Sequence, residues 1–171
     1  MTHAGLLRVE AVRRRLADAV ADEKGMLEII GCQFVADEPT VFGTPNEDWH
    51  ARELEWYLSK SRSVYDIPGE VPKIWREVAC YDGRINSNYG WCVFSDDNGL
   101  QYESALGHLL RDPYSRHGVM IYTRPSMHLD AFANTRYDFM CTNTVQLLIR
   151  DGALHYYVSM RSSDAVLGYK G

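Results

Sequence analysis

The sequence predicts a single α+β domain that occupies residues 1–171. Candidate helices and strands alternate along the chain without an internal repeat or a linker, and two of the strands are joined by a two-residue turn. The composition agrees with one packed core, because 46% of the 171 residues are apolar and 24% are charged. These proportions exclude a disordered chain, a collagen-like fibre and a coiled coil.

The N-terminal segment predicts a helix followed by a strand. Between Leu6 and about Asp22, apolar side chains recur at helical spacing, at Val9, Val12, Leu16 and Val20. The basic triplet Arg13–Arg15 lies mostly off this stripe, so we expect it to face solvent. The run Met26–Val35 is rich in apolar and β-branched residues and predicts a strand, in which Gly31 marks a bulge or a close backbone contact.

Turn-forming and capping residues predict the next elements. A loop with Pro39 and Gly43 leads to Thr44–Glu47, which has the form of a capping box with proline at the first helical position. We therefore expect a helix that runs through Tyr57. The prolines and glycine of Pro68–Pro72 interrupt the chain after this helix.

The second half of the chain predicts a loop, a helix and a hairpin. Tyr81–Gly90 is rich in Asp, Asn and Gly and predicts a loop, whereas Leu100–Arg111 predicts an amphipathic helix. A strand is expected at Val119–Thr123. Two alternating runs then flank Asp151-Gly152, a dipeptide typical of a type I′ hairpin turn. These runs are Thr144–Arg150 and Ala153–Met160.

Charge and cysteine content restrict the classes of function. The 18 Lys and Arg against 23 Asp and Glu give a net charge of −5, so we expect no direct nucleic-acid binding, and any anionic ligand must be small and held by local arginines. Neither a membrane span nor a signal peptide is predicted, which indicates a cytoplasmic protein without a membrane partner. The cysteines lack zinc-binding spacing, so we expect reduced thiols and no metal site. They are Cys32, Cys80, Cys92 and Cys141.

The hairpin register places one of these cysteines beside polar residues. If Arg150 faces Ala153, Cys141 falls opposite Ser162, provided that the ladder continues to the open end of the hairpin. Directly opposed residues are about 5 Å apart. Strict alternation would point Arg161 to the other face, so a bulge or a strand end is needed to bring its guanidinium to the thiol and the hydroxyl.

This arrangement predicts a nucleophile. A guanidinium beside a thiol favours the thiolate, which is the nucleophilic form of cysteine. On spacing alone, two plainer interpretations stay open: Cys141 is a small buried apolar residue, and Arg161 is a surface charge.

The same residues resemble a known family. The segments DFMCTNTVQ (Asp138–Gln146) and MRSSD (Met160–Asp164) resemble the nucleophile strand and the phosphate-binding turn of the thymidylate synthase family. Within that family, further motifs resemble the deoxycytidylate hydroxymethylases of T-even phages, and the resemblance covers essentially the whole chain. These motifs are EIIGCQFVADEP (28–39), RELEWY (52–57), INSNYGW (85–91) and YTRPSM (122–127).

The resemblance implies a thymidylate synthase-like fold, in which helices pack on one face of a mixed β-sheet. It also implies a reaction at carbon 5 of a pyrimidine nucleoside monophosphate. In this reaction a cysteine thiolate adds to carbon 6 and makes carbon 5 nucleophilic, and 5,10-methylenetetrahydrofolate is the co-substrate that supplies the one-carbon unit. Cys141 takes the nucleophile's position. Water in the last step gives a hydroxymethyl product, whereas hydride gives a methyl group.

Other matched positions imply catalytic and phosphate-binding roles. Glu53 matches the glutamate that organises water and proton transfer around the base, and Tyr89 matches a tyrosine near the departing proton. Arg161 and Ser162 match ligands of the nucleotide phosphate. Without the resemblance, Glu53 would be an exposed helix carboxylate and Tyr89 a packing residue.

The resemblance also implies a homodimer and a folate site. Arg116 matches one of two arginines that the family donates across the subunit interface to the partner's phosphate. His117 stands at the second of these positions, where an imidazole offers one donor in place of a charged fork. Trp75 matches an aromatic residue of the folate pocket, and Asp164 lies where the family holds the folate side of the site. Their plainer interpretations are a core tryptophan and a turn aspartate.

Three functions stay open from the sequence. The T-even motifs and Thr142 favour a deoxycytidylate hydroxymethylase, which makes 5-hydroxymethyl-dCMP. A dUMP hydroxymethylase or a thymidylate synthase uses the same chemistry, and the residue that distinguishes cytosine from uracil in the family would follow Gly171. The family pattern continues past this point, so we expect a fold truncated at the C-terminus and little activity from these residues alone. The third candidate is therefore an inactive nucleotide-binding or dimerisation fragment.

Overall fold

The computed structural model describes residues 5–133 and 138–166. The described residues form two compact units, the first from within 1–46 and 163–171 and the second from 47–162. Both units contain helices and strands, which confirms the predicted α+β class.

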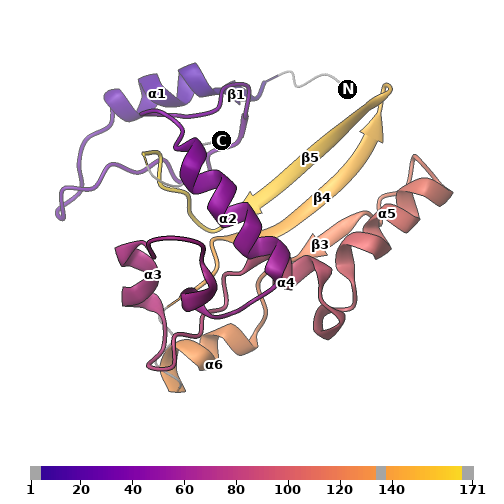
Figure 1. Cartoon of the computed structure of the whole chain (residues 1–171). Helices are drawn as coiled ribbons and strands as arrows, with labels where there is room; N and C mark the ends of the chain where they lie inside the picture. The colour runs from indigo at the N-terminus through magenta and orange to yellow at the C-terminus, as the bar shows by residue number, and fades with distance from the viewer. Residues whose placement is uncertain (1–4, 134–137, 167–171) are drawn as a thin grey trace. The chain divides into compact units, whose positions relative to one another are not determined.

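The second unit contains a three-stranded antiparallel sheet with the strand order β3-β4-β5 (Figure 1). The strands are β3 (Val119–Ile121), β4 (Thr142–Arg150) and β5 (Ala153–Met160). Asp151 and Gly152 join β4 to β5 with φ angles of 53° and 73°, as a type I′ turn requires. The predicted hairpin and its pairing at the turn are confirmed, since Arg150 faces Ala153.

Helices cover one face of this sheet. α4 (Tyr89–Phe94) and α5 (Gln101–Arg111) contact β3, and α2 (Glu47–Ser59) contacts α4. On the opposite face Ile121 is 52% exposed, so the described helices cover β3 and β4 on one side only. Tyr156 and Tyr157, on opposite faces of β5, are both exposed. The buried core between helices and sheet comprises Cys92, Val93, Ala105, Leu109, Met120, Met127, Met140, Val145 and Leu147.

A smaller core lies beside α2. Trp56 is fully buried and packs with Val64, Ile67 and Ile85. α4 approaches α2 so closely that a Cβ atom at Gly90 would clash with the carbonyl oxygen of Tyr57. Glycine is therefore required at this contact, which brings the ends of the two helices together.

The longer helices of this unit agree with the sequence, and the shorter ones were not predicted. α5 confirms the helix expected at Leu100–Arg111, and α2 confirms the helix expected through Tyr57. α2 begins at Glu47, so Pro45 precedes the helix and does not open it. Helices this short carry little periodic signal. The elements without a prediction are α3 (Lys73–Val78), α4, α6 (Ser126–Ala133) and the 3-10 turns Val64–Asp66 and Asp96–Asn98.

The first unit contains a short parallel strand pair and one helix. β1 (Leu7–Arg8) pairs with β2 (Phe34–Val35), and α1 (Val9–Ala17) follows β1 directly. Val9, Val12 and Val41 form its buried core.

Two predicted elements of this unit have the wrong bounds. The helix ends at Ala17 and not near Asp22, and Val20 is 92% exposed. The side chain of Asp22 accepts hydrogen bonds from the backbone N–H groups of Lys24 and Met26, which holds a turn in place of a further helical turn. The strand expected over Met26–Val35 is reduced to Phe34–Val35, since a positive φ angle at Gly31 interrupts the extended chain.

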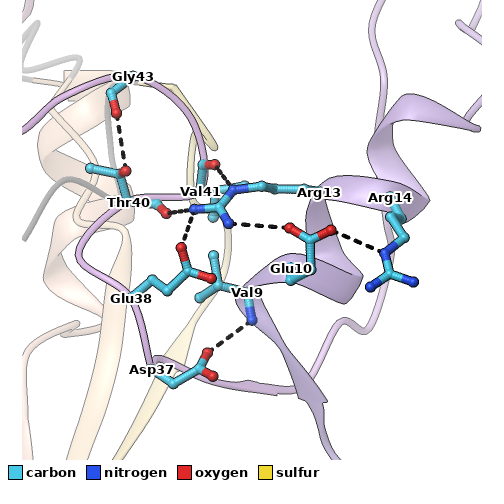
Figure 2. Close-up of polar contacts among 9 residues, drawn as sticks. All are labelled: Val9, Glu10, Arg13, Arg14, Asp37, Glu38, Thr40, Val41 and Gly43. Carbon is cyan, nitrogen blue, oxygen red and sulfur yellow. Dashed lines mark hydrogen bonds and ion pairs between the residues drawn. The ribbon is translucent and has the colours of Figure 1, made fainter.

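The prediction that Arg13 faces solvent is wrong. Its guanidinium donates to the carbonyl oxygens of Thr40 and Val41 and forms ion pairs with Glu10 and Glu38, as Figure 2 shows. The N–H groups of Arg13 therefore hold the loop after β2 against α1. Arg14 and Arg15 are exposed, in agreement with the prediction.

Candidate active site

A β-bulge at the open end of the hairpin brings three predicted residues together. The register set at the turn, where Arg150 faces Ala153, continues to the pair of Thr144 and Ser159. Thr142 then pairs with Met160, so the register shifts by one residue between Thr142 and Thr144. This is the bulge that the sequence argument required. One detail of the register is wrong, because the shift places Cys141 opposite Arg161 and not Ser162: the backbone N–H of Arg161 donates to the carbonyl oxygen of Cys141 at 2.9 Å.

The thiol of Cys141 contacts both predicted polar neighbours. Nη2 of Arg161 lies 3.6 Å from the sulfur, and Oγ of Ser162 lies 3.9 Å from it. Cys141 is half-buried, whereas the other two residues are exposed. The guanidinium and the hydroxyl lie beside the sulfur, and the partial exposure of Cys141 leaves the thiol accessible to a substrate.

The guanidinium of Arg161 is held by neutral acceptors. Nε donates to the carbonyl oxygen of Met140 at 3.0 Å, Nη2 donates to that of Phe139 at 2.7 Å, and Nη1 donates to Ser162 Oγ at 3.1 Å. Arg161 forms no ion pair with the residues that the structure describes. Its charge is thus oriented by the backbone without being neutralised.

Tyr89 reaches the same site from α4. Oγ1 of Thr142 donates to the phenol oxygen of Tyr89 at 3.5 Å, so the tyrosine hydroxyl lies next to the residue that follows the nucleophile. Burial raises the pKa of Tyr89 above 10, and negative charge on Cys141 adds to this shift. Tyr89 is therefore a proton donor at neutral pH. Asn88 positions it by capping α4 with a hydrogen bond to the N–H of Trp91.

Glu53 is linked to Tyr89 through Tyr57. Tyr57 lies one helical turn after Glu53 and is hydrogen bonded to its carboxylate, and the rings of Tyr57 and Tyr89 are 5.4 Å apart. Burial raises the pKa of Glu53 above its ordinary 4.5, which suits a group that exchanges protons. Tyr57 was not among the predicted site residues, although its spacing of four from Glu53 was a visible signal.

Asp138 is a second residue that the sequence analysis missed. It is buried, and its carboxylate accepts from the backbone N–H of Asn86 at 2.6 Å and from the N–H and hydroxyl of Ser87. Since Asn86 and Ser87 precede α4 and Asp138 precedes Cys141, these bonds tie the Tyr89 helix to the nucleophile segment. The carboxylate of Asp138 accepts these hydrogen bonds and forms no ion pair with Arg161.

The remaining predicted residues lie outside this cluster. Trp75 is half-buried, with its ring 5.4 Å from that of Trp56. Asp164 belongs to the first unit, where it accepts from the N–H of Val166 at 2.7 Å. Arg116 and His117 are exposed in the turn before β3. Their predicted role is to bind the phosphate in the active site of a partner subunit.

Among residues 5–133 and 138–166, no three His, Cys, Asp or Glu side chains gather as metal ligands. The helices of the described chain are all too short or too polar to cross a bilayer.

Comparison with known proteins supports one family. The family model for thymidylate synthase matches residues 46–170. The deoxycytidylate 5-hydroxymethyltransferase of Enterobacteria phage T4 is 52% identical over 172 residues, which cover 96% of this chain and 70% of the relative. The thymidylate synthase of Bacillus phage phi3T is 28% identical over 145 residues, which cover 80% of this chain and 50% of that protein.

Solved structures agree on the fold. Thermostable thymidylate synthase A from Bacillus subtilis superposes with a TM-score of 0.52 and 26% identity, covering 68% of this chain and 42% of the other. The thymidylate synthase of T4 phage gives a TM-score of 0.59 over 94% of this chain and 63% of the other, and at 17% identity this match indicates the fold alone. The resemblance predicted from the motifs is confirmed, as is the predicted fold class.

Proposed function

Because this chain belongs to the thymidylate synthase family and is a homologue of deoxycytidylate 5-hydroxymethyltransferase, we propose that it serves one-carbon transfer from 5,10-methylenetetrahydrofolate to carbon 5 of dCMP, which water completes to 5-hydroxymethyl-dCMP. The observation that carries this proposal is the thiol of Cys141 within 3.6 Å of Arg161, an arginine without a carboxylate partner among the described residues. The 52% identity to the hydroxymethyltransferase, against 28% to the synthase, favours cytosine and water over uracil and hydride.

Cys141 is the proposed nucleophile. A pyrimidine ring is a weak nucleophile at carbon 5. Addition of the thiolate to carbon 6 saturates the C5–C6 bond and leaves an enamine across carbons 4 and 5, which makes carbon 5 nucleophilic. Arg161 and Ser162 are the polar groups that contact the sulfur. After water has added to the new exocyclic carbon, departure of the thiolate restores the ring, so that no net bond to sulfur remains.

The Glu53, Tyr57 and Tyr89 chain is the proposed proton path. Carbon 5 must lose its proton after it has formed the new carbon–carbon bond, and the base changes charge during the reaction. Tyr89 lies beside Thr142, next to the nucleophile, and a hydrogen bond connects Tyr57 to Glu53. A carboxyl whose pKa is raised by burial exchanges protons closer to neutral pH than an exposed one.

Arg161 and Ser162 are the proposed ligands of the nucleotide phosphate. Arg161 is pinned by the carbonyl oxygens of Phe139 and Met140, so little side-chain entropy is lost when a phosphate binds. One N–H group of Nη1 has no acceptor among the described residues and is a donor to the phosphate, and the neighbouring hydroxyl is a second.

A homodimer would complete this phosphate site. Val119, Gln146 and Tyr157 form one cross-strand row on the helix-free face of the sheet, where Val119 is 36% and Tyr157 57% exposed. The amide of Gln146 donates to the carbonyl oxygen of Arg116, which places Arg116 at the margin of this face. Pairing of two such faces would present Arg116 and His117 to the partner subunit.

The surface of α3 fits a flat heterocycle such as the pterin of a reduced folate. Ile74 is 57% exposed and Trp75 is half-buried beside Trp56, so an aromatic and an aliphatic side chain meet solvent together. Bound folate supplies the methylene carbon and leaves as tetrahydrofolate. Trp75 would pack against it, and Asp164 is the proposed polar contact.

Covalent trapping tests the proposal. Incubation with 5-fluoro-dCMP and methylenetetrahydrofolate, followed by denaturing mass spectrometry, should show an adduct on Cys141 because fluorine blocks loss of the carbon-5 substituent. Cys141→Ser should abolish the adduct. Cys32→Ser is the matched control, since Cys32 is also a half-buried free thiol, and it should retain the adduct.

The alternatives give different outcomes in the same assay. A stronger adduct with 5-fluoro-dUMP would support a uridylate enzyme. No adduct with either analogue would support a non-catalytic nucleotide-binding or dimerisation fragment.

Subunit mixing tests the dimer. Arg116→Ala and Cys141→Ser homodimers should each have little activity, and their equimolar mixture should regain up to about a quarter of the wild-type activity, because half of the dimers contain one intact site. An additive, unrestored activity would contradict donation of Arg116 across an interface.

A further inference from the structure

A cavity of about 400 Å³ borders the guanidinium of Arg161 on the second unit. Its walls come from the segment after β3, from α6 and from the bulged end of the hairpin. The residues that matter for the argument are Thr123, Arg124, His128, Phe139, Asn143 and Arg161. A cavity of this volume accommodates a phosphate group together with part of the molecule that carries it.

The lining of this cavity favours an anion. Two of its side chains are arginines, and Thr123, His128 and Asn143 add hydroxyl, imidazole and amide groups that donate hydrogen bonds. Its lining, which lies wholly in the described part of the chain, contains no Asp or Glu. Two guanidinium groups at one cavity without a carboxylate create a positive potential that a dianion would neutralise.

Arg124 is held in place without being neutralised. Its guanidinium stacks on the ring of Trp91 at 4.9 Å, and Nη1 donates to the carbonyl oxygen of Tyr122 at 2.9 Å. Nη1 also lies 3.7 Å from the sulfur of Cys92. The other terminal nitrogen, Nη2, is shielded from solvent and has no hydrogen-bond partner in the described chain.

A shielded N–H group of a charged side chain without an acceptor is costly, and such groups in folded proteins usually have a partner. No described carboxylate pairs with this arginine, since its contacts are a carbonyl, a thiol and an aromatic face. Arg124 also lines the adjoining cavity, so a phosphate bound there would supply the missing negative charge.

We propose that this cavity receives the nucleotide phosphate and that Arg124 is a second phosphate-binding arginine beside Arg161, contributed by the same subunit. The identity of the nucleotide rests on the proposed function, whereas the recognition of phosphate rests on the cavity itself. Arg161 binds from the nucleophile side, and Arg124 binds from the segment that follows β3.

Equilibrium binding of three probes to the full chain tests this assignment. The probes are dCMP, deoxycytidine and inorganic phosphate, measured by calorimetry. Arg124→Gln should weaken binding of dCMP and of inorganic phosphate by about 10- to 100-fold, the loss expected for one charged hydrogen bond, and should leave deoxycytidine unchanged. Arg124→Lys retains the charge and should lose less.

The matched control is Arg62→Ala. The guanidinium of Arg62 stacks on the same Trp91 ring at 4.2 Å but does not line the cavity. Its loss should lower the melting temperature without changing the ratio of dCMP to deoxycytidine affinity. This control separates a phosphate contact from general loosening around Trp91, and the affinity ratio stays informative even if Arg124→Gln is less stable.

Two results would overturn the assignment. If Arg161→Ala reduces the affinity ratio and Arg124→Gln does not, Arg124 is not a phosphate ligand and the proposed function stands. If Arg124→Gln weakens dCMP and deoxycytidine equally, its role is structural. Phosphate binding that depends on Arg124 in a chain that forms no Cys141 adduct would support the cavity and contradict the proposed reaction, so the two failures are distinguishable.

Discussion

Arg13 in the first unit and Arg161 in the second are both held by backbone carbonyl oxygens, but only Arg13 also forms ion pairs with carboxylates of the described chain. Arg13 donates to two carbonyl oxygens and forms ion pairs with Glu38 at 2.7 Å and Glu10 at 3.4 Å (Figure 2). Arg161 also donates to two carbonyl oxygens, yet its other contacts are a hydroxyl and a thiol. The first arginine joins a helix to a loop, whereas the second is oriented and keeps its positive charge.

This difference indicates how a binding arginine can be distinguished from a structural one. Bonds to neutral acceptors fix the plane of a guanidinium, and carboxylates cancel its attraction for an anion. The nearby carboxylate of Asp138 fits this distinction, because it is occupied by the backbone of Asn86 and Ser87. Four predictions test the distinction.

The largest effect is expected from Arg161→Ala. This change removes the cation beside Cys141 and at least one donor to the phosphate, so kcat/KM should fall roughly 100- to 1,000-fold. Arg161→Lys retains a charge but not the fork and should fall roughly 10- to 100-fold. Steady-state kinetics with dCMP and methylenetetrahydrofolate provide the measurement.

The contrast with Arg13 would break if Arg161→Ala lowered stability as much as activity. Thermal melting of the same preparations checks this point. A variant that is unfolded would place Arg161 among structural arginines.

A stability effect is expected from Asp138→Ala. The change leaves the N–H groups of Asn86 and Ser87 without their acceptor in a buried position, which should lower the free energy of unfolding by about 2–4 kcal/mol. Urea denaturation at pH 7 measures it. Asp138→Asn retains one acceptor oxygen and should lose less, and equal losses for the two variants would show that the carboxylate's acceptors are not what holds this segment.

A pair of neighbouring arginines sharpens the comparison in the first unit. Arg13→Ala breaks the link between α1 and Thr40–Val41, whereas Arg14→Ala removes only an exposed ion pair with Glu10. Surface pairs of the second kind contribute little. The melting temperature should therefore fall measurably for Arg13→Ala and hardly at all for Arg14→Ala, and neither change should alter the ratio of dCMP to deoxycytidine affinity. A fall in that ratio would place Arg13 in the binding machinery.

The fold was predictable where the sequence signal is local and long. The hairpin, α2 and α5 follow from alternation, capping and helical spacing within their own segments. Met26–Val35 has strand composition but forms only two strand residues, because a strand also needs a partner and extended backbone, and Gly31 interrupts it. Composition alone carries neither condition.

The active-site cluster was predictable in part. Hairpin register brings Cys141, Arg161 and Ser162 together, and the need for a bulge follows from strand alternation. Tyr57 and Asp138 could not be predicted because their roles depend on contacts between segments distant in sequence. Asp138, for example, accepts a hydrogen bond from Ser87, which lies 51 residues earlier in the chain. Arg124 could not be predicted as a site residue for the same reason, since its stacking on Trp91 forms only when the chain folds.

The smallest effect concerns pH and extends the comparison from arginines to carboxylates. A hydrogen bond from Arg8 lowers the pKa of Asp37 in the first unit, and bonds from Arg14 and Arg13 lower that of Glu10. Their stabilisation is present above the unfolded-state values and is lost as pH falls through the folded values. Burial raises the pKa of Glu53 above 4.5, so the ionised form of Glu53 is disfavoured by folding and its effect has the opposite sign.

Glu53→Gln should therefore make stability at pH 7 higher relative to stability at pH 4 than it is in the wild type. The wild type loses the contribution of protonated Glu53 as pH rises through the raised pKa, and glutamine has no proton to lose. Urea titrations at the two pH values, with the exposed Glu47→Gln as the control, measure the difference. If Glu53→Gln left the difference in unfolding free energy between pH 7 and pH 4 unchanged, the Glu53 carboxylate would be solvated in the folded protein. The proton path from Glu53 through Tyr57 to Tyr89 would then lose the buried group on which it depends.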